Sequence, residues 1–198
     1  DRTEVGRYLR WLERERGLTF ATYEDLQRWS VADLAAFWAS IWDFFEVRSS
    51  APYTAVLEHE AMPGARWFPG ARLNFAEHLL GADDDLDANA LIALGQTRDR
   101  IDLTFRELRE EVARARAGLR RLGIGRGDVV AAYLPNIPET LVLFAATASL
   151  GATFASCAPE LGSRSVIDRL VQLEPKILFA VASYGYRTKT IDRREELV

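Results

Sequence analysis

The apolar run VVAAYL at residues 129–134 decides the fold class of this chain. A continuous apolar stretch of this length is typical of a strand that is buried on both faces, as in a parallel sheet covered by helices. The segments that follow alternate in kind: a helix from Pro138 to Leu150, a strand at 153–156, a helix through Val166, Leu170 and Leu173, and a strand at 176–182. This alternation predicts an α/β fold with a parallel, doubly wound sheet and right-handed crossovers.

The residues that precede the run fit the same architecture. Residues 90–94 and 101–103 are predicted to form two short strands around a turn. Thr104 and Glu107 form a capping box, which marks the start of a helix. The apolar face of that helix recurs at helical spacing and consists of Phe105, Leu108, Val112, Ala115, Leu119 and Leu122.

The first part of the chain differs in composition. All five tryptophans lie within the first 67 residues, and the acidic stretch at 83–87 separates this part from the remainder. We predict a mostly helical, Trp-rich extension over residues 1–82 and the α/β domain over residues 88–198. The aromatic residues of the extension are expected to be core and packing residues. Ser30, with Asp33 three positions on, is the expected N-terminal cap of the helix that follows.

Composition excludes several classes of protein. Of 198 residues, 48% are hydrophobic and 27% charged, which is ordinary for a globular protein. The net charge of −4 provides no general field for nucleic acid or an anionic membrane, and neither is expected as a partner. No apolar stretch approaches the ~20 residues of a membrane helix. The chain has one cysteine, Cys157, which excludes a disulfide framework. It has two histidines, too few for a multi-histidine zinc site. We therefore expect a cytoplasmic protein.

Two motifs that suggest chemistry have better structural explanations. Glycines 123, 125 and 127 follow a helix and precede a strand, whereas a phosphate-binding loop follows a strand and opens a helix. We interpret them as a helix stop and a tight turn. Cys157 ends a short apolar strand with no histidine near it in sequence, and it is expected to be a small buried hydrophobic residue.

Ligands of open α/β sheets bind outside the carboxyl ends of the strands. Two such ends are predicted, at residues 156–160 and 183–189. The second combines two tyrosines, a glycine, Arg187 and Lys189. It suits a phosphate or a stacked nucleotide base. A solvated loop, with charges that serve solubility, explains the same residues, and the sequence pattern leaves both interpretations open.

Several segments together resemble one family, the acetoacetyl-CoA synthetases of the adenylate-forming acyl-CoA synthetase superfamily. The segment WFPGARLNFAEHLL at residues 67–80 is similar to the one that opens their catalytic region. Further similar segments are residues 103–108, 127–136, 146–152 and 168–180. The Trp-rich part resembles the N-terminal extension of the family. His78 stands where the family usually has Asn, and Arg187 and Thr188 replace small residues of a Tyr-x-Tyr-x-x-Lys pattern that is otherwise kept.

The resemblance implies a two-step ligase. ATP, with Mg²⁺, activates a carboxylate as an acyl-adenylate, and the thiol of coenzyme A then displaces AMP. Ser156, Arg187 and Lys189 correspond by position to residues that touch CoA in related enzymes. The family's ATP loop, ribose-binding motif, substrate pocket and catalytic lysine lie beyond Val198. This chain is thus expected to be an N-terminal portion without catalytic or metal-binding residues, and inactive alone.

The resemblance favours acetoacetate as the small-molecule substrate. Two alternatives remain: an acetyl- or propionyl-CoA synthetase-like ligase, and a non-catalytic module that binds a partner through its aromatic face.

Overall fold

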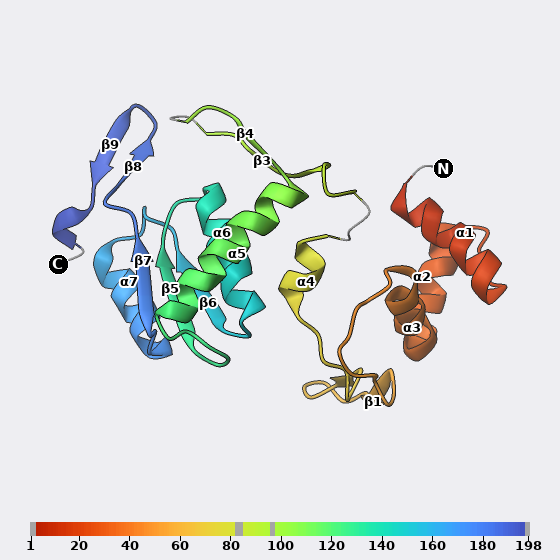
Figure 1. The fold of residues 1–198 in the computed structure, drawn as a ribbon. Coiled ribbons are helices and arrows are strands. Elements are labelled where there is room, and N and C mark those ends of the chain that lie inside the picture. Colours follow the sequence, from red (N-terminus) through yellow and green to blue (C-terminus); the bar gives the residue numbers. More distant parts are fainter. Residues whose placement is uncertain (1–2, 82–84, 96–97, 197–198) are drawn as a thin grey trace. The chain divides into compact units, whose positions relative to one another are not determined.

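The computed structural model describes residues 3–81, 85–95 and 98–196 (Figure 1). These residues form two compact units, the first ending at Leu73 and the second beginning at Asn74. The first unit contains three helices around a small aromatic-rich core. They are α1 (Glu4–Arg16), α2 (Tyr23–Ala32) and α3 (Leu34–Phe44), followed by the short antiparallel strands β1 (Leu57–His59) and β2 (Arg66–Trp67). The core consists of Tyr8, Leu12 and Leu26, with Trp11, Trp29 and Phe37 packed against it.

One expectation about this unit was wrong. Asp33, not Ser30, caps α3, because its carboxylate accepts a hydrogen bond from the backbone N–H of Ala36 at 2.9 Å. Ser30 lies inside α2, where its hydroxyl donates to a carbonyl of its own helix. Trp38 and Trp67 are packing residues at the edge of the core, since their rings contact each other while they remain 41% and 40% exposed.

The second unit opens with α4 (Phe75–Leu79), the antiparallel pair β3 (Asn89–Ala93) and β4 (Ile101–Thr104), and α5 (Phe105–Arg121). The predicted capping box is confirmed: Thr104 Oγ1 accepts from the N–H of Glu107, and the Glu107 carboxylate accepts from the N–H of Thr104. Helix α4 packs against α6, and Asn74 Nδ2 donates to the carbonyl of Ala148 at 3.0 Å. By contact, α4 therefore belongs with the α/β part. The acidic stretch at 83–87 falls partly on residues 83–84, outside the described residues, and the domain limits 1–82 and 88–198 stay predictions.

The predicted parallel sheet is confirmed. Its strands β5 (Val129–Tyr133), β6 (Thr153–Cys157) and β7 (Ile177–Ala180) run parallel in the order β6-β5-β7. They alternate with α6 (Pro138–Ser149), α7 (Ser163–Leu170) and the 3₁₀ turn η2 (Val171–Leu173). Helices α5 and α6 cover one face and α7 covers the other, as Figure 1 shows.

Strand β5 reveals why the sequence run is apolar throughout. Val130 and Ala132 belong to the core against α5 and α6, whereas Ala131 and Tyr133 belong to the core against α7. A strand with helices on both faces needs apolar side chains at every position.

The segment after β7 was predicted as a loop, and this was wrong. It forms an antiparallel hairpin of β8 (Ser183–Tyr186) and β9 (Lys189–Asp192), followed by the 3₁₀ turn η3 (Arg194–Glu196). The two-residue connection places Arg187 at φ 55°, in the left-handed region. Hairpins of this length usually carry Asn or Gly there, and the arginine conceals the turn signal in the sequence.

Candidate functional site at the carboxyl edge of the sheet

Three segments meet beyond the carboxyl ends of the parallel strands. Tyr133 is the last residue of β5, and Pro159 and Leu161 follow β6. Tyr184 lies in β8 of the hairpin that follows β7, and Arg193 directly follows β9 of the same hairpin. We call these five residues the carboxyl-edge cluster. In a parallel sheet all carboxyl ends lie along one edge, which is where α/β folds bind ligands.

Tyr133 links β5 to the segment after β6. Its hydroxyl lies 3.1 Å from the carbonyl oxygen of Pro159 and also within donating distance of the carbonyl of Leu161. Burial raises the pKa of the phenol above its ordinary value. The group therefore remains a neutral donor, which suits its two carbonyl partners.

Arg193 links the hairpin to the same segment. Its Nη2 donates to the carbonyl of Pro159 at 2.8 Å and to the hydroxyl of Tyr184 at 3.3 Å. Its guanidinium carbon lies 5.6 Å from the centre of the Tyr184 ring, and Nη1 pairs with the Glu196 carboxylate. Hydrogen bonds to Glu196 and then Tyr184 raise the pKa of Arg193, and its side chain is only 13% exposed.

The sequence-predicted residue Ser156 lies on β6, one position before the strand ends. It is paired in register with Ala132 of β5 and is exposed. Successive side chains of a strand point to opposite faces. Because Cys157 belongs to the core against α7, Ser156 faces the α6 side of the sheet.

Arg187 and Lys189 lie at the tip of the hairpin. Both are exposed, and the Arg187 guanidinium carbon lies 5.7 Å from the centre of the Tyr186 ring. Lys189 is the register partner of Tyr186 across the hairpin. Among the residues that the structure describes, neither cation forms an ion pair. At the base of the hairpin, by contrast, the hydrogen bonds from Arg194 lower the pKa of Asp192 to about 2.

The structure thus brings two of the three predicted residues together. Arg187 lies in the hairpin turn and Lys189 begins β9 two residues later, so both cations lie at the same end of the hairpin. Ser156 lies on β6, and β5 separates that strand from β7, where the hairpin begins. At a strand spacing of ~4.8 Å, β6 and β7 are roughly 10 Å apart. A ligand that touches Ser156 as well as the hairpin must therefore extend along the carboxyl edge.

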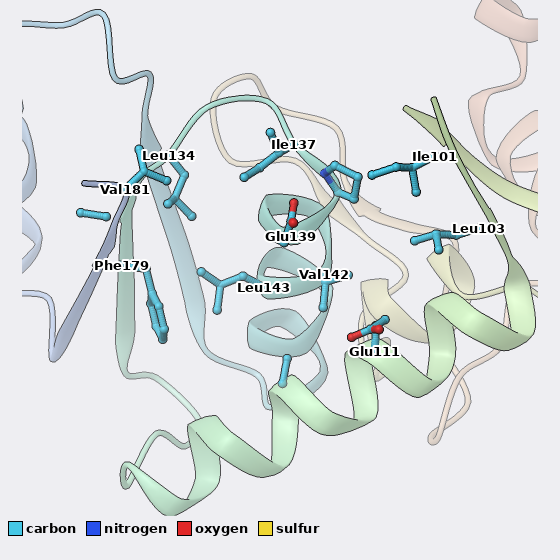
Figure 2. A pocket seen from close by; sticks show the side chains of 13 residues that line it. Ile101, Leu103, Glu111, Leu134, Ile137, Glu139, Val142, Leu143, Phe179 and Val181 are labelled. Atoms are coloured by element: carbon cyan, nitrogen blue, oxygen red, sulfur yellow. The ribbon is translucent and has the colours of Figure 1, made fainter. Parts of the chain in front are cut away.

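An apolar pocket of about 660 Å³ lies beside this edge, between β4, α5, α6 and the end of β7 (Figure 2). Leu134, Leu143 and Phe179 line it together with other apolar side chains, and its carboxylates are Glu111 and Glu139. Glu139 is bound by both terminal nitrogens of Arg98 at 2.7 and 3.0 Å. None of Ser156, Arg187 and Lys189 lines this pocket, whose acidic and apolar walls do not suit a phosphate.

Four further expectations from the sequence concern Cys157, the glycine turn, metal ligands and membrane helices. Cys157 is buried at 7% exposure and unpaired, as expected of a small hydrophobic residue. The glycine turn is confirmed as a turn, since the N–H of Gly125 donates to Asp128 Oδ2 at 2.7 Å. In the described ranges no three His, Cys, Asp or Glu side chains are grouped as metal ligands would be. No helix within those ranges has the length and apolar character needed to cross a membrane.

Sequence reasoning missed Tyr133 and Arg193. One signal was present for the tyrosine: it ends an otherwise aliphatic strand, and a buried Tyr hydroxyl usually has a hydrogen-bond partner. No signal in the sequence distinguished Arg193, because it is one of 23 arginines and is followed directly by another, Arg194.

Comparison with known proteins places this geometry in a family. Residues 81–197 match the family described as AMP-binding enzyme, and residues 23–79 match the acetyl-coenzyme A synthetase N-terminus. The chain is 40% identical to an acetoacetyl-coenzyme A synthetase of Rhizobium meliloti, over 97% of this chain and 29% of that protein. It is 37% identical to a malonamoyl-CoA synthetase of Penicillium aethiopicum, over 99% of this chain and 28% of that protein.

A solved structure agrees with these sequence matches. The acetoacetyl-CoA synthetase of Streptomyces lividans superimposes with a TM-score of 0.92 and 44% sequence identity, over 99% of this chain and 31% of that one. The chain thus spans less than a third of the length of these relatives and matches their N-terminal part. The family match over 81–197 covers the whole parallel sheet and the hairpin. The chain belongs to the AMP-binding enzyme family.

Proposed function

We propose that the full-length protein carrying this chain is an ATP-dependent ligase that joins acetoacetate to coenzyme A through an acyl-adenylate. One observation carries the proposal: identity of 34–44% to acetoacetyl-CoA synthetases extends over 97–99% of the chain, including both units. The likeness therefore does not depend on one motif.

The reaction balances in two steps. The carboxylate oxygen of the acid attacks the α-phosphorus of ATP, an acyl–AMP bond forms, and pyrophosphate leaves. The sulfur of CoA then attacks the acyl carbon, AMP leaves with the bonding pair, and the thiol proton passes to solvent. The division replaces a poor leaving group, hydroxide, by a good one, AMP.

Within this chain, we propose that the hairpin tip binds a phosphate of the CoA nucleotide. Arg187 and Lys189 supply two exposed cations without carboxylate partners in the described part of the chain. Ser156 supplies a hydroxyl farther along the same edge. The donors fit the chemistry of a phosphate, which accepts hydrogen bonds from guanidinium, ammonium and hydroxyl groups.

ATP and Mg²⁺ are proposed to bind mainly outside these 198 residues. Magnesium offsets the charge of the phosphates when bound. The described residues contribute no group of three potential ligands to such a site. We also propose a cytoplasmic location, a prediction that the single, unpaired Cys157 supports.

A second substrate is favoured by one comparison, the 37% identity to a malonamoyl-CoA synthetase. Acetoacetate and malonamate share the group –CO–CH₂–COO⁻ and differ in a methyl against an amino group. A pocket that hydrogen-bonds the shared carbonyl would accept both and discriminate against acetate and propionate, which would leave those donors unpaired.

The test measures AMP formation by the full-length protein with CoA, ATP, Mg²⁺ and each of four acids: acetoacetate, malonamate, acetate and propionate. We expect the highest kcat/KM for acetoacetate, with malonamate next. A preference for acetate or propionate would assign the protein to the acetyl or propionyl branch. No turnover with any acid, from protein that is folded, would favour a non-catalytic module.

A further inference from the structure

Arg193 connects two segments that lie far apart in the sequence. It follows β9 directly, and its backbone N–H donates to the carbonyl of Ala182 at 2.8 Å, which closes the base of the hairpin. Its side chain leaves the hairpin and donates to the carbonyl of Pro159, 34 positions earlier in the sequence. One residue therefore fixes both the closure of the hairpin and its contact with the segment after β6.

The other end of this contact is equally constrained. The carbonyl of Pro159 that accepts from Arg193 also lies 3.1 Å from the hydroxyl of Tyr133. Tyr133 is 3% exposed and is the last residue of the central strand. The hairpin is thus connected through Arg193 and Pro159 to the most buried strand of the sheet, in addition to the short link after β7.

The contact needs a guanidinium. Nη2 donates to Pro159 and Tyr184 while Nη1 pairs with Glu196, so two nitrogens of one planar group serve three partners at once. An ammonium group is a point charge and lacks this fork. The Nε of Arg193 is buried and has no hydrogen-bond partner among the described residues.

We infer that Arg193 is a positioning residue that holds the β8–β9 hairpin against the segment after β6, so that Arg187 and Lys189 meet the CoA phosphate in one fixed place. The inference rests on the proposed function, since it assigns to Arg193 an effect on CoA that acts through the two cations. Arg193 itself is paired with Glu196 and largely buried, which leaves it poorly placed to bind the phosphate directly.

The experiment uses the full-length protein and the variants Arg193→Ala and Arg193→Lys. We expect each to raise the KM for CoA about fivefold, with little change in kcat and none in ATP–pyrophosphate exchange driven by acetoacetate, which precedes CoA binding. If Arg193 acted only as a positive charge, Arg193→Lys would keep the wild-type KM, and the inference would be wrong. An equal loss in pyrophosphate exchange would reveal a general structural role and would also overturn it.

The matched control is Arg194→Ala. Arg194 is the next residue, is 75% exposed and pairs with Asp192, the last residue of β9. We expect wild-type kinetics for this variant. A rise in KM as large as that of Arg193→Ala would mean that any lost arginine at this position has the same effect, and the specific role of Arg193 would be excluded.

A double-mutant cycle with Lys189→Ala tests the route of the effect. If Arg193 acts through the hairpin cations, its removal in the Lys189→Ala background should raise the KM for CoA less than twofold further. If the double variant raised the KM for CoA by the product of the two single-variant factors, the residues would act independently, contrary to the inference.

Hydrogen exchange separates failure of the inference from failure of the proposed function. Arg193→Ala should speed amide exchange in β8 and β9 while leaving β5 unchanged, whatever reaction the protein catalyses. Unchanged exchange in the hairpin overturns the anchoring role. If the hairpin of Arg193→Ala exchanges faster than that of the wild type, but the wild-type protein makes no acyl-CoA, the anchoring role is retained and the proposed ligase function is rejected.

Discussion

The ammonium group of Lys176 lies 3.1 Å from Asp128 Oδ2 and donates to the carbonyl of Gly123 at 2.6 Å. Lys176 directly precedes β7, and Asp128 directly precedes β5. The pair therefore joins the two strands at their amino ends, opposite the carboxyl-edge cluster. Asp128 also accepts a hydrogen bond from the N–H of Gly125, so the same carboxylate closes the glycine turn that precedes β5.

Stability should depend on pH through Asp128. The N–H of Gly125 and then the Lys176 ammonium hold the pKa of this carboxyl below its ordinary value. A lowered folded-state pKa stabilises the fold above the unfolded pKa of about 3.9, and this stabilisation is lost as pH falls through the folded value. Asp128→Asn should therefore lower the melting temperature between pH 6 and 8, and the difference should shrink below pH 4.

The matched control for Asp128 is Glu110→Gln, an exposed carboxylate whose partner Arg114 is 4.0 Å away. Exposed pairs of this kind contribute little, so its melting curve should follow wild type at every pH. If the difference in melting temperature between Asp128→Asn and the wild type stayed constant down to pH 2, the assigned role of the carboxylate would be wrong.

Helix α5 provides a second prediction about stability. Thr104→Ala removes the acceptor for the N–H of Glu107 and should cost about 1 kcal/mol of unfolding free energy. Thr104→Ser keeps the hydroxyl and should lose much less. Urea unfolding of the α/β domain measures both. Equal losses for the two variants would attribute the effect to the lost methyl group and not to the cap.

The sheet could be predicted from sequence because each of its elements has a local signature. The run 129–134 is apolar at every position since helices cover both faces of β5, and Thr104 with Glu107 marks the start of α5 by itself. The hairpin could not be predicted in the same way. Gly185 is a poor strand former that lies within β8, and Arg187 occupies a positive-φ position where Asn or Gly would normally indicate the turn.

The carboxyl-edge cluster was beyond sequence reasoning for a different reason. Its hydrogen bonds connect residues 26 and 34 positions apart, and each depends on where two strands end. Ser156, Arg187 and Lys189 were found through family resemblance and their place after strands. Arg193 looks from sequence like any other surface arginine, and only its burial and its bond to Pro159 single it out.

The hairpin cations should be separable by mutation. Lys189 belongs to the paired strand β9, whereas Arg187 lies in the turn and rests on the ring of Tyr186. A strand position holds a side chain more firmly than a turn position does. We therefore expect Arg187→Ala to raise the KM for CoA by about threefold in an assay of acyl-CoA formation. This rise is smaller than the one expected for Lys189→Ala in the same assay. A larger effect of Arg187 would place the phosphate over the turn and not beside β9.

Lys189→Ala tests the CoA site directly in the full-length protein. A charge-assisted contact is worth about 1.5–3 kcal/mol when shielded and less when exposed, so for this exposed lysine we expect ~1.4 kcal/mol, a tenfold rise in the KM for CoA. ATP–pyrophosphate exchange should be unchanged, because CoA has not yet bound. Raising the salt concentration should weaken CoA binding in wild type more than in the variant, since one screened contact is missing. If the KM for CoA and its salt dependence both stay at wild-type values, the hairpin tip is a solvated turn and the phosphate binds elsewhere.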